Sequence, residues 1–168
     1  MPEVYHSGER EIQLKTGENL IADRNGAVIT DTIIKGAINF IEKQPMAIVS
    51  SSNPENEIWT SILIGDFGFT KVPHPNAIVF DKEKIKSNAD DIFFKNIASN
   101  YTIGSLFIEL DTRRRFRING ESELDGNKIS VTIKEAYPNC PKYIQRRIIS
   151  MPEYFKETNP VITEGIKL

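Results

Sequence analysis

Apolar residues with a period of two predict strands in the middle and at the end of the chain. The clearest example is residues 128–134, where Ile129, Val131 and Ile133 alternate with polar side chains. The same alternation, or a short apolar run bounded by turn residues, predicts further strands at residues 46–51, 58–64, 77–80, 104–110 and 113–124. Residues 72–76 are expected to form a loop. Six antiparallel strands with a few helices favour a small β-barrel with helical additions.

Apolar residues at helical spacing follow two possible N-caps. Asp31 can cap a helix that ends at Gln44-Pro45 and whose apolar face carries Ile33, Ile34, Ala37, Ile38 and Ile41. Ser87 and Asp90 form a capping-box pattern ahead of Ile92, Phe93 and Ile97. A third helix is expected from Pro141 to about Ile149, because proline suits the first helical position.

Both ends of the chain differ from its middle. Residues 1–29 are polar and broken by glycines, which predicts an N-terminal arm with a helical turn or two at residues 9–14. Residues 150–168 are charged and broken by prolines, so we expect a tail over a surface or a partner subunit. At 168 residues, the whole chain (1–168) is expected to form a single domain.

Composition removes several classes of protein. The chain is 39% hydrophobic and 26% charged, as in ordinary globular proteins. A formal net charge of -2 argues against a general nucleic-acid binder. One cysteine cannot form an internal disulfide, and no signal-like start or membrane-length apolar run is present. We therefore expect a cytoplasmic protein without membrane partners.

Three arginines could form an anion site on the strand expected at residues 113–124. Arg113, Arg115 and Arg117 share one face, opposite Phe116 and Ile118. Alternate residues lie about 6.6 Å apart, so the three guanidinium groups repel one another unless anions or carboxylates lie among them. Forked guanidinium donors suit phosphate. The alternative is a solvated face paired with Glu109, Asp111 or Glu121.

A second possible anion site is the start of the helix expected at Pro141. Free N–H groups and the ammonium of Lys142 would lie together there. The alternative is an ordinary turn into a surface helix. Cys140 could be reactive at this position, but a cysteine that is packed or lies behind the site is favoured, because no second cysteine lies nearby and neither histidine is placed as its base.

Motifs for other chemistries are missing from the sequence. His6 and His74 have no metal-ligand spacing, so no metal site is predicted. There is no phosphate loop, dinucleotide fingerprint or nucleophile elbow.

Four blocks of sequence together resemble one family. They are Asn139–Gln145 (Asn-Cys-Pro-Lys-Tyr-Ile-Gln), Thr112–Gly120, Trp59–Gly65 followed by Gly68-Phe69, and Tyr5–Glu9. The four blocks follow one another along the chain in the family's order, and together they resemble one branch of the pyridoxamine 5′-phosphate oxidase-like, FMN-binding split-barrel proteins. The resemblance implies a six-stranded split β-barrel, bound FMN, and a homodimer with the flavin at its interface.

The resemblance also implies residues for the cofactor and a reaction. The cofactor residues would be Trp59, Thr60, Ser61, Phe80, Asp81, Arg113, Arg115, Arg117, Asn139, Lys142 and Gln145. The expected activity is two-electron transfer between FMN and a small molecule or partner reductase, with NAD(P)H or a separate reductase as donor. One alternative is a non-catalytic carrier of flavin or haem. Another is a barrel that binds single-stranded nucleic acid through its arginine strand.

Overall fold

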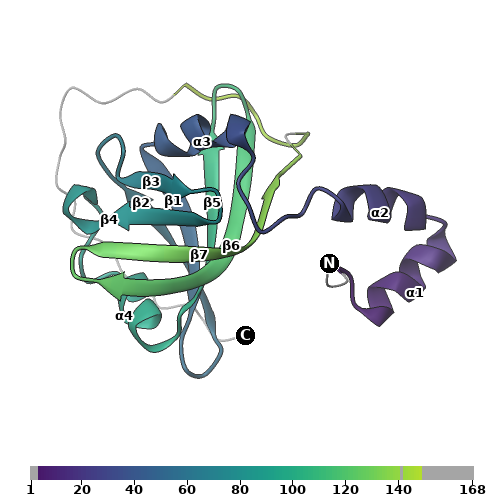
Figure 1. Cartoon of the computed structure of the whole chain (residues 1–168), viewed down its shortest axis with the longest axis horizontal. Helices are drawn as coiled ribbons and strands as arrows, with labels where there is room; N and C mark the ends of the chain where they lie inside the picture. The colour runs from purple at the N-terminus through teal and green to yellow at the C-terminus, as the bar shows by residue number, and fades with distance from the viewer. Residues whose placement is uncertain (1–3, 141, 149–168) are drawn as a thin grey trace, which may run out of the picture.

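The computed structural model describes residues 4–140 and 142–148 and contains one antiparallel sheet. Its strands pair in the order β2-β1-β5-β6-β7-β4-β3 (Figure 1). Their bounds are β1 Met46–Ser52, β2 Ile58–Ile64, β3 Thr70–His74, β4 Ala77–Asp81, β5 Thr102–Glu109, β6 Arg114–Asp125 and β7 Lys128–Pro138. The predicted class, mainly β and antiparallel with helices, is confirmed.

The predicted number of strands is wrong, because the sheet has seven and not six. The additional strand is β3, which occupies part of the loop expected at residues 72–76. Pro73 lies within it and cannot donate a ladder hydrogen bond, but β3 is an edge strand, where proline is tolerated. The other edge is β2, so the sheet is open between these two strands.

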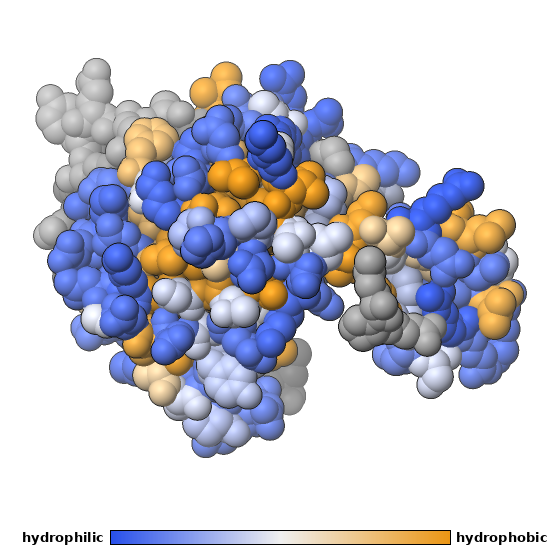
Figure 2. Space-filling view, in the orientation of Figure 1, coloured by the Kyte–Doolittle hydropathy of each residue, from blue (hydrophilic) through white to orange (hydrophobic). Residues whose placement is uncertain are grey.

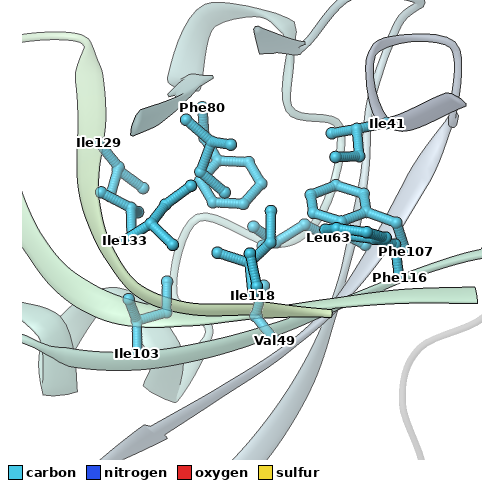
Figure 3. Packing of buried hydrophobic residues seen from close by; sticks show 14 of the residues in the cluster. Ile41, Val49, Leu63, Phe80, Ile103, Phe107, Phe116, Ile118, Ile129 and Ile133 are labelled. Carbon is cyan, nitrogen blue, oxygen red and sulfur yellow. The ribbon is translucent and has the colours of Figure 1, made fainter. Parts of the chain in front are cut away.

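The core lies on the inner face of the curved sheet, where alternate strand residues are buried. Phe80 of β4 stacks on Phe107 of β5 with ring centroids 6.3 Å apart. Helix α3 (Lys35–Glu42) adds Phe40 and Ile41, and α4 (Ile92–Ser99) adds Phe93 and Ile97. Figure 3 shows side chains from separate strands and from α3 meeting in this space. Burying each such side chain contributes about 1.5–3 kcal/mol.

Both predicted helix caps are wrong. The residue before α3 is Ile34, not Asp31, and α4 is capped by Asp91, whose carboxylate accepts from the Phe93 N–H at 2.9 Å. Ser87 instead fixes the edge strand: its hydroxyl donates to the Ile62 carbonyl at 2.9 Å and accepts from the Ile64 N–H at 2.7 Å. The Ser87 hydroxyl therefore bonds to the distant strand β2 and does not cap the nearby helix α4. A short 3-10 helix, η1 (Lys82–Lys84), follows β4.

The N-terminal arm is more helical than expected and stands away from the sheet (Figure 1). It consists of α1 (Ser7–Thr16) and α2 (Asn19–Gly26). A capping box between His6 and Glu9 opens α1. Apolar side chains remain at the surface of the arm (Figure 2), with Leu14 and Leu20 each 68% exposed. The arm therefore has little core of its own.

The helix expected from Pro141 to Ile149 is not formed by residues 142–148, which are turn and irregular structure. Long-range backbone bonds explain this: the Asn139 N–H donates to the Arg115 carbonyl at 3.1 Å, and the Arg147 N–H donates to the Leu110 carbonyl at 3.2 Å. Pro141 and the expected tail at 150–168 lie outside the described residues. Among those described, no helix is both long and apolar enough to cross a membrane.

Candidate functional site

A row of polar residues crosses five strands on the outer face of the sheet, opposite the core. The register aligns Thr60 of β2, Ser50 of β1, Gly104 of β5, Asn119 of β6 and Glu135 of β7. The Asn119 amide donates to the Glu135 carboxylate at 2.9 Å. A groove of about 170 Å³ lies over the first four residues of this row. We call it the outer groove.

Glycine keeps the floor of the outer groove open. A Cβ at Gly104 would lie 2.5 Å from Ser50 Oγ and 3.3 Å from Asn119 Oδ1. Both distances are shorter than an ordinary van der Waals contact. Any larger residue at Gly104 would therefore push into the space between β1 and β6. An adjoining hollow of about 370 Å³ shares Ser50, Gly104 and Asn119.

Arg117 is the cation of the outer groove. It lies one row further along, in register with Leu106 of β5 and Tyr137 of β7. Its side chain is exposed and lines the groove. Within the residues that the structure describes, the guanidinium group forms no ion pair or hydrogen bond. Its charge is thus available to an anion.

Arg115 and Asn139 meet at the end of the same sheet face. They share the backbone bond described above, and both line a hollow of about 340 Å³ beside α3. Arg115 Nε and Asn139 Oδ1 are buried and have no hydrogen-bond partner in the described part of the chain. Buried polar atoms of this kind are rare in folded proteins and call for an explanation such as a ligand. A phosphorylated, hydroxyl-bearing cofactor fits this donor and acceptor set.

The predicted arginine face is confirmed for two of its three members. Arg115 and Arg117 alternate with buried Phe116 and Ile118, as expected. Arg113 precedes the strand, in the turn, with φ 64°, so its predicted place on the strand is wrong. Arg114 begins β6 instead, with its guanidinium group 4.7 Å from the centroid of the Phe40 ring.

The strand at Trp59, Thr60 and Ser61 divides these residues between two faces. Only Thr60 lines the outer groove. Ser61 is buried on the other side, where its hydroxyl donates to Asp91 at 2.5 Å. Trp59 alternates with Thr60 and is 45% exposed at the sheet edge, so it is not simply a core residue.

The other predicted cofactor residues do not join the outer groove. Phe80 is fully buried in the core, and Asp81 caps η1 and pairs with Lys84 at 3.3 Å. Lys142 and Gln145 are exposed in the irregular segment. The Lys142 ammonium lies 5.5 Å from the Tyr143 ring centroid, and the Gln145 side chain accepts from Arg147.

Two further sequence-based interpretations concern residues 139–142. The helix that would have placed free N–H groups beside Lys142 is not formed, so that form of the anion site is wrong. Cys140 is exposed, so the packed alternative for this thiol is wrong.

Four residues of the polar row were not predicted: Ser50, Gly104, Asn119 and Glu135. Asn119 continues the alternation of Arg115 and Arg117 and could have been found from it. Ser50 and Gly104 could not have been found without the register of β1 and β5.

Comparison with known proteins gives a fold and no family. The sequence matches no protein-family model and no curated protein. Among solved structures, HupZ from group A Streptococcus is 13% identical, with a TM-score of 0.50 over 63% of this chain and 93% of that one. A candidate pyridoxamine 5′-phosphate oxidase from Lactobacillus delbrueckii is 10% identical, with a TM-score of 0.51 over 64% of this chain and 95% of that one. The chain has the fold of these proteins. The branch that carries the Asn139–Gln145 motif stays a prediction.

Proposed function

We propose that the protein binds FMN on the outer face of its sheet and uses it as a two-electron oxidoreductase. The observation that carries the proposal is the set of unpaired polar groups on that face: the guanidinium group of Arg117 and the buried atoms Arg115 Nε and Asn139 Oδ1. The shared fold with a candidate pyridoxamine 5′-phosphate oxidase supports it. A bound flavin would supply the redox chemistry.

Each group of the outer face has a task in this proposal. Arg117 and Arg115 neutralise the phosphate and donate forked hydrogen bonds to it. The Thr60 and Ser50 hydroxyls and the Asn119 amide can each donate and accept, which suits a chain of ribityl hydroxyls. In this arrangement the other predicted cofactor residues have no direct contact with the cofactor. They are Trp59, Ser61, Phe80, Asp81, Arg113, Lys142 and Gln145.

A second copy of the chain would complete the site. Ile58 is 79% exposed, and Ile62 and Ile64 of the same outer face are exposed as well. Contiguous exposed apolar surface is typical of an interaction site. We propose a homodimer in which these residues are covered and water is excluded from the flavin.

The absorption spectrum of the purified protein, followed by anaerobic mixing of the FMN-loaded form with NADH and NADPH, tests the function. Loss of the visible flavin absorbance with either donor supports an oxidoreductase. No loss with either one favours a separate reductase or a non-catalytic carrier. A haem Soret band in place of a flavin spectrum would overturn the choice of cofactor.

A further inference from the structure

A larger hollow, of about 510 Å³, opens beyond the end of β5. Its walls come from residues 43–45 between α3 and β1, from Phe67 after β2, from residues 108–111 at and beyond the end of β5, and from residues 146–148. We call it the β5-end cavity. None of the predicted cofactor residues lines it.

One side of the β5-end cavity is apolar. Phe67 lies on it and is 78% exposed, in the turn closed by the bond from the Phe69 N–H to the Asp66 carbonyl. Gly68 has φ 76° in this turn, which a side chain would strain. Pro45, Ile108, Leu110 and Ile148 line the same cavity. An aromatic ring held beside apolar walls suits a planar ligand.

The other side of the cavity is positively charged. Lys43 is neutralised by Glu109, and the hydrogen bond from Lys43, followed by that from Thr112, lowers the pKa of Glu109. Arg146 Nε donates to the Asp111 carbonyl at 2.6 Å, and Arg147 Nη1 donates to the Arg146 carbonyl at 3.0 Å. These acceptors are neutral.

The charges of the cavity therefore do not cancel. Arg147 Nη2 also donates to a neutral group, the Gln145 amide oxygen. Among the described residues that line the cavity, Lys43 and Glu109 are paired and two guanidinium groups face the carboxylate of Asp111, which leaves one positive charge. A ligand with one anionic group would balance it.

The β5-end cavity adjoins the outer groove. Leu106 lines the groove and Ile108 lines the cavity, and both belong to the same face of β5. Two residues of a strand span about 6.6 Å. A ligand in the cavity would thus lie beside one in the groove.

We propose that the β5-end cavity binds a planar, largely apolar molecule that carries one carboxylate or phosphate group. Phe67 and the neighbouring apolar walls contact the planar part, and the guanidinium groups of Arg146 and Arg147 bind the anion. The binding of this ligand does not depend on the proposed function. Its role as the substrate does rest on the proposed function.

The experiment titrates flavin-free protein with 2-naphthoate and with neutral 2-naphthamide, by calorimetry. Arg147→Gln is expected to weaken 2-naphthoate about tenfold and to leave 2-naphthamide unchanged, because only the charge-assisted contact is lost. Phe67→Ala is expected to weaken both probes. Arg24→Gln, the same charge change on the exposed arm, is the control and should change neither.

Three results would overturn the proposal: no saturable 2-naphthoate binding by folded protein, equal effects of Arg147→Gln on the two probes, or competition between 2-naphthoate and FMN. Competition would mean that the cavity belongs to the flavin site. If FMN binds and 2-naphthoate does not, only this inference fails. If 2-naphthoate binds and FMN does not, only the proposed function fails.

Discussion

Replacing Arg117 by glutamine tests whether this side chain binds the phosphate of the flavin and not its ring. The side chain is exposed and forms no ion pair or hydrogen bond within the described residues. Its removal should therefore leave the fold unchanged. Arg115, two residues away on the same face, would still contribute its own charge.

The expected loss of FMN affinity is about tenfold. A hydrogen bond to a charged group contributes about 1.5–3 kcal/mol. Because Arg117 is exposed and screened by solvent, the lower end of that range applies. About 1.4 kcal/mol corresponds to a tenfold change in Kd.

The assay is a fluorescence titration of flavin-free protein with FMN and, separately, with riboflavin, which lacks the phosphate. Arg117→Gln should weaken FMN and leave riboflavin unchanged. Arg113→Gln is the matched control, with the same charge change but located in the turn before β6. Equal losses for FMN and riboflavin, or equal effects of the two variants on FMN, would refute the assignment of Arg117 to the phosphate.

Three other substitutions test the geometry of the sheet. Gly104→Ala should weaken FMN severalfold in the same titration with little change in Tm, because only side-chain atoms need to move, with Ser50 rotating and Asn119 shifting slightly; a large fall in Tm would contradict this. Gly120→Ala should lower the free energy of unfolding by about 3 kcal/mol in urea, because its Cβ would lie 2.2 Å from the Thr132 carbonyl oxygen of the paired strand. The lowered pKa of Glu109 stabilises the fold above the ordinary value of 4.5, and this stability is lost as the pH falls through the folded pKa. Glu109→Gln should therefore reduce the free energy of unfolding at neutral pH and lose this effect in acid, and a pH-independent difference would contradict the reasoning.

The parts of the fold that were predictable depend on local pattern. Six of the seven strands follow from alternation or from a short apolar run, and the phase of the alternation in β6 correctly placed Arg115 and Arg117 opposite Phe116. Strand β3 was missed because it contains Pro73, which usually breaks a strand. Proline is tolerated in an edge strand, but which strand lies at the edge cannot be read from the sequence.

The errors share a physical cause, which is competition from distant partners. Ser87 matches a capping box, but it bonds to β2. The backbone after Pro138 could have started a helix, but Asn139 pairs with Arg115. Ser50 and Gly104 belong to the candidate site only because strand register brings them beside Thr60.

A crystal structure of the protein grown with FMN would test the central claim most directly. We expect the phosphate within hydrogen-bond distance of Arg117 or Arg115, with ribityl oxygens over Thr60 and Asn119. Flavin bound elsewhere, or crystals of folded protein that contain no flavin at saturating FMN, would contradict it.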